Sequence, residues 1–186
     1  LRAKFIVGVG LGYKRLYIWV EGEDDVRFFD KIIKPKFVGK YNFVEVRPFA
    51  KLKKEKIDNF LRSIEAMNDE YIYVRDINDS PCVSYKKQKI QDELRNIDKN
   101  RIIVVIREIE SWYLAGSDDV ISRKFGVRPF NITDNITKEQ FNDMIPKKFD
   151  SRIDFMLEIL KCFSIEKAKE KNRSFRYFIE KYFCKT

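Results

Sequence analysis

Histidine is missing from all 186 residues of the sequence. Its absence excludes Ser-His-Asp and Cys-His catalytic groups, a histidine general base and a histidine-ligated zinc ion. The three cysteines, Cys82, Cys162 and Cys184, are widely spaced and odd in number, so they indicate neither a zinc ribbon nor a disulfide framework. We expect a reducing, cytoplasmic compartment. Any metal ion would need oxygen ligands, which favours Mg²⁺, Mn²⁺ or Ca²⁺.

Glycine and proline are scarce, with 7 and 5 residues, which excludes collagen and Pro/Gly-rich disorder. No apolar run approaches the length of a membrane-spanning helix, so we expect no contact with a membrane. The apolar stretch 5–12 is too short for a signal sequence and lacks a cleavage site, and the role of residues 1–14 stays open. A hydrophobic content of 44% and this chain length predict one globular domain over residues 1–186.

The net charge of +9 is unevenly distributed along the chain. Residues 1–60 carry 14 basic and 8 acidic side chains, residues 61–120 carry 9 and 12, and residues 121–186 carry 15 and 9. Basic flanks around an acidic middle suit a carboxylate site surrounded by groups that attract the phosphates of DNA or RNA. A lysine-rich solvated surface is the simpler alternative.

Apolar and β-branched runs predict four strands, each followed by a helical pattern. This alternation predicts an α/β fold with a mainly parallel four-stranded, Rossmann-like sheet flanked by helices. A helical extension, residues 117–186, is expected to pack on the core, residues 15–116. The expected strands are 16–20, 42–49, 71–74 and 101–106. The expected helices are 24–35, ended by Pro35, then 53–67, 85–97, 108–115, 118–125, 138–145, 151–163, 164–171 and 175–183, with Gly116 as a stop signal and Thr137 as an N-cap.

Acidic residues follow three of the four predicted strands: Glu21, the loop from Asp76 to Asp79, and the pair Glu108 and Glu110. Functional sites of parallel sheets lie at the carboxyl ends of the strands, so these residues are candidates for one site. Carboxylates gathered in a cleft repel one another, and a divalent cation removes that cost. Such an ion can stabilise the oxygens of phosphoryl transfer without histidine.

Each acidic position also has a purely structural interpretation. Glu21 could form a strand-to-helix turn with no chemistry, and Asp24 or Asp25 could be only a helix N-terminal charge. The Asp76–Asp79 loop could be an ordinary Asx turn, and Glu110 could pair with a lysine on a solvated helix face.

Four other features favour a structural role. Trp112 and Tyr113 are expected in the core, and Cys82 is expected to be a small buried residue and not a nucleophile. The glycines at 8, 10 and 12 match a nucleotide-binding loop only weakly, because the expected strand, loop and helix are missing.

Two segments resemble the motifs of a Toprim domain. Residues 16–29, LYIWVEGEDDVRFF, resemble its first strand and the Glu-Gly-x-x-Asp turn that opens the next helix. Residues 71–79, YIYVRDIND, resemble the second motif, a strand ending in Asp-x-Asp, except that Asn78 stands in the second acidic slot. This departure puts the second metal ligand in doubt and leaves Asp79, one place further on, as its replacement.

The chain also resembles uncharacterised prokaryotic Toprim-like proteins related to the OLD-family nucleases. Members of this group have a cysteine soon after the Asp loop, as with Cys82, and then Glu-x-Glu-x-Trp-x-Leu-Ala, as in residues 108–115. They tend to end in a helix with Ser-Phe, as at Ser174 and Phe175. Four motifs in order over residues 15–183 make the resemblance fairly specific.

The resemblance implies a Toprim fold whose acidic cluster binds Mg²⁺ or Mn²⁺ and acts on phosphodiester bonds. When the roles of the Toprim motifs are transferred to this sequence, Glu21 and Asp76 are the expected catalytic residues. Glu21 would be a general acid/base or a carboxylate close to the metal. The expected metal ligands are Glu21, Asp25, Asp76, Asn78 or Asp79, and Glu110, with Glu108 less certain. No other cofactor-binding residue is implied.

Three functions remain open at this point. The first is a metal-dependent nuclease-like enzyme acting on DNA or RNA, and the second is a non-catalytic nucleic-acid-binding or assembly module with the same fold. The third, a nucleotide-handling enzyme, would need a phosphate loop that the sequence does not show. OLD-family nucleases add an ATPase domain, and because no Walker motif occurs here, an ATPase partner would have to be a separate subunit.

Overall fold

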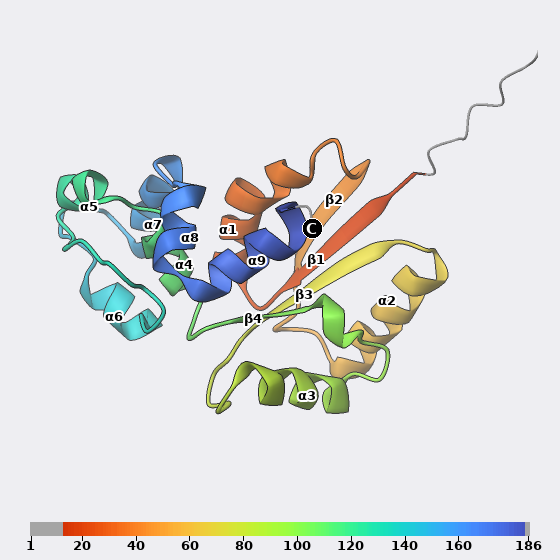
Figure 1. Ribbon diagram of the computed structural model, residues 1–186. Helices are drawn as coiled ribbons and strands as arrows, with labels where there is room; N and C mark the ends of the chain where they lie inside the picture. Colours follow the sequence, from red (N-terminus) through yellow and green to blue (C-terminus); the bar gives the residue numbers. More distant parts are fainter. Residues whose placement is uncertain (1–12, 185–186) are drawn as a thin grey trace, which may run out of the picture.

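A computed structural model of the protein describes residues 13–184. The apolar stretch 5–12 and the glycines at 8, 10 and 12 lie outside the described residues. Four parallel strands form one sheet in the order β2-β1-β3-β4 (Figure 1). The strands are β1 (Arg15–Val20), β2 (Phe43–Pro48), β3 (Glu70–Asp76) and β4 (Ile102–Val105). The prediction of an α/β fold with a parallel, Rossmann-like sheet is confirmed.

Helices cover both faces of the sheet. Successive residues of a strand point to opposite faces, and apolar side chains on both faces need to be buried. On β1, Leu16, Ile18 and Val20 belong to one buried apolar cluster and Trp19 belongs to the other. The cluster of Trp19 is covered by α2 (Lys54–Ala66) and α3 (Val83–Glu93), which lie below the sheet in Figure 1. The opposite face is covered by α1 (Glu23–Phe28) and α9 (Arg173–Phe183).

The helical segment after β1 does not end at Pro35, so that prediction is wrong. After α1 the chain continues as a π-helical turn over Phe29–Ile33 and then a 3-10 turn over Lys34–Phe37. Pro35 lies in the first turn of the 3-10 segment, where a helix needs no backbone N–H donor. Phe29, Ile33 and Phe37 are fully buried, and their packing holds the irregular segment on the sheet.

The remaining helices pack on the side of α1 and α9, and their buried aromatic side chains belong to the same apolar cluster as the sheet residues. Thr137 caps α6 and Gly116 ends α4, as predicted. A 3-10 turn over Lys99–Arg101 precedes β4. The helices are α4 (Glu110–Ala115), α5 (Asp119–Phe125), α6 (Lys138–Asp143), α7 (Arg152–Lys161) and α8 (Ile165–Lys171). Across residues 13–184, no helix has the length and apolar character needed to cross a membrane.

Candidate active site

The carboxyl ends of β1, β3 and β4 meet at one edge of the sheet, because these three strands are neighbours. Glu21 follows β1, Asp76 ends β3, and Glu110 begins the helix after β4. With Asp25 and Glu108 they line a cavity of about 290 Å³. The backbone N–H of Asp76 lies 3.4 Å from Oε2 of Glu21, so the first two motifs are in direct contact. The structure therefore brings together all three acidic segments that the sequence singled out.

Asp25 lies in the first turn of α1 and is 6% exposed. Its Oδ2 accepts a hydrogen bond of 3.1 Å from the backbone N–H of Gly22, which fixes the carboxylate at the start of the helix. Burial raises the pKa of Asp25 to about 7, and the charges of Glu21 and Glu110 add to this effect. Asp25 is thus both a helix N-terminal charge and a member of the acidic cluster.

Asp76 is the most strongly perturbed carboxyl group of the cluster. Burial, and after it the charges of Asp25 and Glu21, raise its pKa to about 9. Its Oδ1 atom is buried and has no hydrogen-bond partner within residues 13–184. A buried carboxylate oxygen without a donor is costly, so this atom marks the place where a cation or a proton would be most stabilising.

Glu110 is 3% exposed, so it does not lie on a solvated helix face. The guanidinium of Arg152, at the start of α7, forms an ion pair with Glu110 on α4 and a second one with Asp24 on α1. Burial raises the pKa of Glu110 despite this partner. For Asp24, hydrogen bonds from Arg152 and Arg27 outweigh burial and lower the pKa. Arg152 thus ties α7 to α1 and α4 beside the site, and nothing in the sequence around it indicates this role.

Asn78 and Asp79 take different positions relative to the acidic cluster. Asn78 has a φ of +48°, a left-handed conformation that asparagine tolerates better than most residues. The turn leaves Asn78 at the boundary of two cavities and turns Asp79 toward the second one. Asp79 is exposed and does not line the cavity of Glu21 and Asp76.

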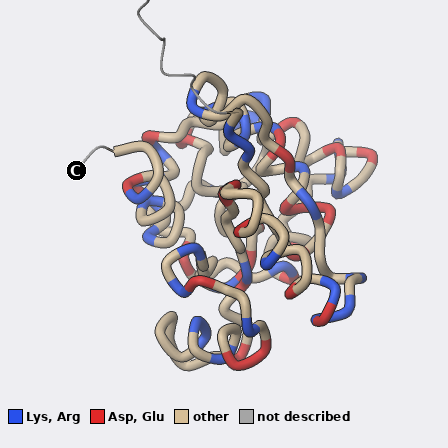
Figure 2. Tube along the Cα trace, turned by 90° about the vertical axis from the view of Figure 1, so that its right-hand side faces the viewer, with Lys and Arg blue, Asp and Glu red and all other residues tan. Residues whose placement is uncertain are grey.

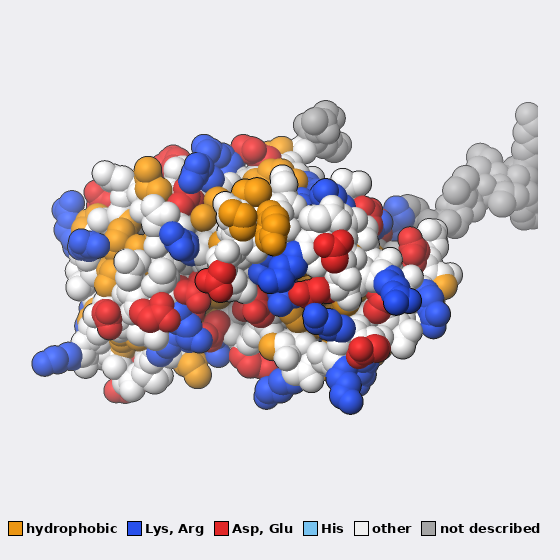
Figure 3. Space-filling model, turned by 90° about the horizontal axis from the view of Figure 1, so that it is seen from below, with side chains coloured by type: hydrophobic (Ala, Val, Ile, Leu, Met, Phe, Trp, Pro, Cys, Tyr) orange, Lys and Arg blue, Asp and Glu red, His pale blue; other side chains and the backbone are white. Residues whose placement is uncertain are grey.

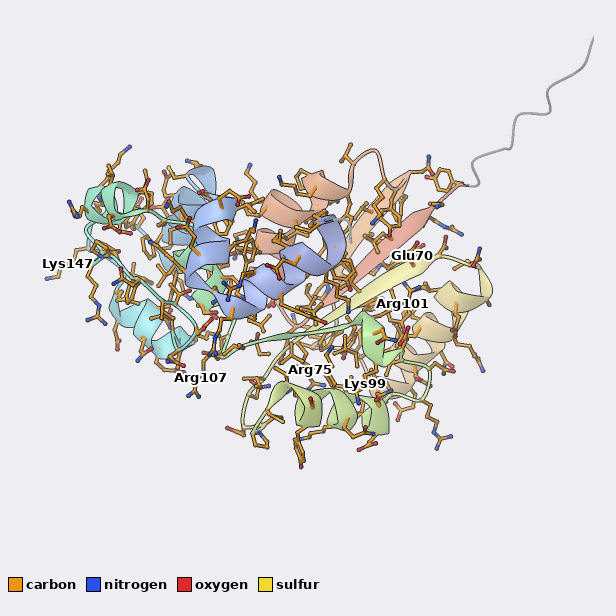
Figure 4. The ribbon with its side chains drawn as sticks, in the orientation of Figure 1. Glu70, Arg75, Lys99, Arg101, Arg107 and Lys147 are labelled. Carbon is orange, nitrogen blue, oxygen red and sulfur yellow. The ribbon has the colours of Figure 1, made fainter. Side chains whose placement is uncertain are left out.

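A second cavity of about 760 Å³ adjoins the acidic one and shares Asn78 and Glu108 with it. Four basic side chains line it, and Lys86 is the only one of them that is nearly fully buried, at 5% exposure. Figure 4 labels Arg75 above α3 and Arg107 between α3 and α6. Figure 3, the view from below, shows acidic side chains across the middle of this face with Lys and Arg beside them. The four basic residues are Arg75, Lys86, Lys89 and Arg107.

Cys82 is exposed, so the prediction of a small buried residue is wrong. It is the N-cap of α3, and its Sγ accepts a hydrogen bond of 3.5 Å from the backbone N–H of Tyr85. Trp112 and Tyr113 are fully buried, as predicted. The indole N–H of Trp112 donates to Oγ of Ser174 on α9 at 2.8 Å, which ties the last helix to the segment that carries Glu110.

The acidic side chains do not form a ready-made ligand set. No group of three or more Cys, Asp or Glu in the part of the chain that the structure describes is arranged to hold one metal ion. The donors are nevertheless of the right chemistry, because carboxylate and amide oxygens are the ligands that Mg²⁺ and Mn²⁺ prefer. The orphaned Oδ1 of Asp76 shows that one of these oxygens lacks the partner a cation would provide.

Comparison with known proteins gives no relative. No protein-family model, no curated protein and no solved structure matches the chain.

Proposed function

We propose that the protein is a metal-dependent enzyme of the Toprim type that cleaves phosphodiester bonds in DNA or RNA. The observation that carries this proposal is the buried Oδ1 of Asp76, which has no partner within residues 13–184 and lies among carboxylates at the carboxyl edge of the sheet. The order of the acidic motifs along the chain and the basic cavity beside them support the same conclusion.

Glu21 and Asp76 would hold the metal ion, and Asp25 would provide further negative charge at the start of α1. A bound Mg²⁺ or Mn²⁺ would polarise a phosphate oxygen and neutralise charge that develops during phosphoryl transfer. Because Mg²⁺ commonly keeps water molecules and binds substrate oxygens, two protein carboxylates are enough to hold it when nucleic acid is present. Asn78 lines the same cavity and could contribute its amide oxygen, whereas Glu110 is already bound by Arg152.

The residues of the chain have separable tasks in this scheme. Glu21 lines the cavity and is only partly buried, so its carboxylate is accessible to both a metal ion and a substrate. Arg152 holds Asp24 and Glu110 in position and balances part of the negative charge of the cluster. Apolar packing beneath the site, with Trp112 fixed to Ser174, keeps the end of β4 in place.

A second candidate is a nucleic-acid-binding or assembly module without catalysis. The ion pair between Arg152 and Glu110, and the outward position of Asp79, favour it because both withdraw candidate ligands from the cluster. Such a module, like the enzyme, could work with a separate ATPase subunit.

Cleavage of labelled DNA and RNA with Mn²⁺ or Mg²⁺ tests the proposal. We expect activity in the wild type, none in the presence of EDTA, and losses of at least about 10²-fold in Glu21→Gln and Asp76→Asn. Asp143→Asn, at the exposed end of α6, is the matched control and should retain activity. Metal-independent binding without cleavage would favour the module, and undiminished cleavage in both site variants would refute the proposal.

A further inference from the structure

The basic cavity contains a buried lysine without a partner. Lys86 on α3 lines the 760 Å³ cavity and is 5% exposed. Its ammonium group forms no hydrogen bond and no ion pair with any residue in the range 13–184, whereas its backbone N–H donates to the carbonyl of Cys82. The stem of Lys86 is buried while its ammonium group stays accessible from the cavity, so the side chain can offer its charge to an anion bound there.

Lys86 lines the basic cavity, and the charges of both cavities act on it. Burial lowers its pKa, the charges of Arg75 and Lys89 lower it further, and those of Glu21 and Asp76 raise it. It therefore lies within electrostatic reach of both the basic cavity and the acidic cluster. An anion bound by Lys86 would lie next to the site proposed for phosphodiester chemistry.

Arg75 provides a second cationic group of the cavity. It precedes Asp76 on β3 and lies on the α3 side, where its Nη1 is 3.2 Å from Oε2 of Glu93. Its Nε is buried and has no partner among the described residues. A buried arginine donor on β3 and a lysine ammonium from α3 at the same cavity are suited to the oxygens of a phosphate group.

The cavity also holds four acidic residues, and two of them are already engaged. Glu93 is paired with Arg75, and Glu108 accepts a hydrogen bond from the backbone N–H of Lys138. Asp79 and Glu139 are exposed, as are the basic Lys89 and Arg107, so solvent screens both signs of charge there. Figure 2 shows both signs of charge interspersed along the chain. Among the four basic side chains of the cavity, Lys86 is the one that is both largely buried and without a partner in the described residues.

We propose that Lys86, with Arg75 and Arg107, binds a backbone phosphate of a polynucleotide strand adjacent to the phosphate at the acidic cluster. This inference rests on the proposed function, because the acidic cluster defines where the reacting phosphate lies. The shared residues Asn78 and Glu108 form the boundary between the two cavities, so one strand can occupy both at once.

The test is the affinity for a fluorescent single-stranded oligonucleotide, measured by anisotropy in EDTA so that cleavage is silent. We expect Lys86→Met to weaken binding by roughly ten- to one-hundred-fold and to reduce the salt slope by about 0.7. Lys87→Met removes the same charge from the same helix outside the cavity and should change affinity by less than about twofold. Equal losses in the two variants would overturn the proposal.

Thermal stability separates binding from a structural role. Removing an ammonium group that has no protein partner should leave the melting temperature of Lys86→Met unchanged or raise it, whereas a structural lysine would lower it. Should Lys86→Met not fold, Arg107→Gln on the opposite wall changes an exposed side chain and must weaken binding in the same direction. Unchanged affinity in Arg107→Gln would then overturn the proposal.

Competition distinguishes the source of the phosphate. Displacement of the oligonucleotide by inorganic phosphate or a 5′-mononucleotide at comparable concentration would overturn the assignment to a backbone phosphate, and no displacement supports it. The outcome is independent of catalysis, because Lys86-dependent binding in EDTA would stand even if no nuclease activity were found. Conversely, Mn²⁺-dependent cleavage with unchanged binding in Lys86→Met would overturn only the phosphate site.

Discussion

Replacing Arg152 by methionine tests whether an internal cation holds the acidic edge together. The guanidinium joins Glu110, whose side chain is 4% exposed, to Asp24, whose side chain is 22% exposed. Asp24 keeps a second partner, because Nη1 of Arg27 lies 2.6 Å from its Oδ1. Glu110 has no other lysine or arginine partner within the described residues. The cost of the variant therefore comes mainly from Glu110, which is left buried and unpaired.

Breaking a buried ion pair by removing one partner costs about 3 kcal/mol, and we expect Arg152→Met to lose this much free energy of unfolding in urea at pH 8. The double variant Arg152→Met/Glu110→Gln should recover more than half of the loss, since no charge is then stranded. The loss should shrink toward pH 5. Burial raises the pKa of Glu110 and Arg152 lowers it, so without Arg152 the carboxyl group takes up a proton more readily as the pH falls.

Two results would refute this reasoning. One is a loss below about 0.5 kcal/mol in Arg152→Met, which would mean that the pair behaves like an exposed surface contact. The other is a double variant as unstable as the single one, which would place the cost in lost packing of the Arg152 side chain.

Three further predictions concern stability. The pKa of Asp76 is raised to about 9, so above about pH 4 the folded state binds more protons than the unfolded state. The free energy of unfolding of the metal-free protein should therefore fall by up to about 1.4 kcal/mol per pH unit between pH 5 and pH 8. Asp76→Asn should flatten this slope in urea unfolding. A stability that rises with pH would contradict it. Gly116→Ala places a Cβ 2.2 Å from the ring of Phe163 and should cost about 1–3 kcal/mol, with partial recovery in Gly116→Ala/Phe163→Leu measured by thermal denaturation. Ser174→Ala removes the acceptor of the buried indole N–H of Trp112 and should cost about 1–3 kcal/mol of the free energy of unfolding in urea. Ser84→Ala, on the exposed side of α3, is the control and should be neutral. Equal effects of the two variants would refute a stabilising role for the hydrogen bond between Trp112 and Ser174.

The sheet was predictable because β1, β3 and β4 contain short, buried apolar runs, whereas β2 is only partly buried and alternates apolar with charged residues. Residues 102–105, IIVV, are all buried between two layers of helices, and such a strand needs no alternation of polar side chains. The end of the helix after β1 was not predictable, because Pro35 is tolerated in the first turn of a new 3-10 segment.

Only those site residues that directly follow a strand of the sheet could be predicted from the sequence. Glu21, Asp76 and Glu110 follow neighbouring strands, so their positions in the chain bring them to one edge. Arg152 and Lys86 depend instead on how α7 and α3 pack and rotate, which the charge pattern of a helix does not specify. The direction of Asp79 depends on the left-handed conformation of Asn78, and a single asparagine in a loop does not fix it.

The central claim is that Asp76 takes part in binding a divalent cation for phosphodiester chemistry. Titration calorimetry with Mn²⁺, in the presence of a saturating single-stranded oligonucleotide with a cleavage-resistant backbone, tests it most directly. We predict saturable Mn²⁺ binding by the wild type that is lost in Asp76→Asn and retained in Asp143→Asn. Equal binding by the wild type and Asp76→Asn, or no binding by the wild type, would contradict the claim.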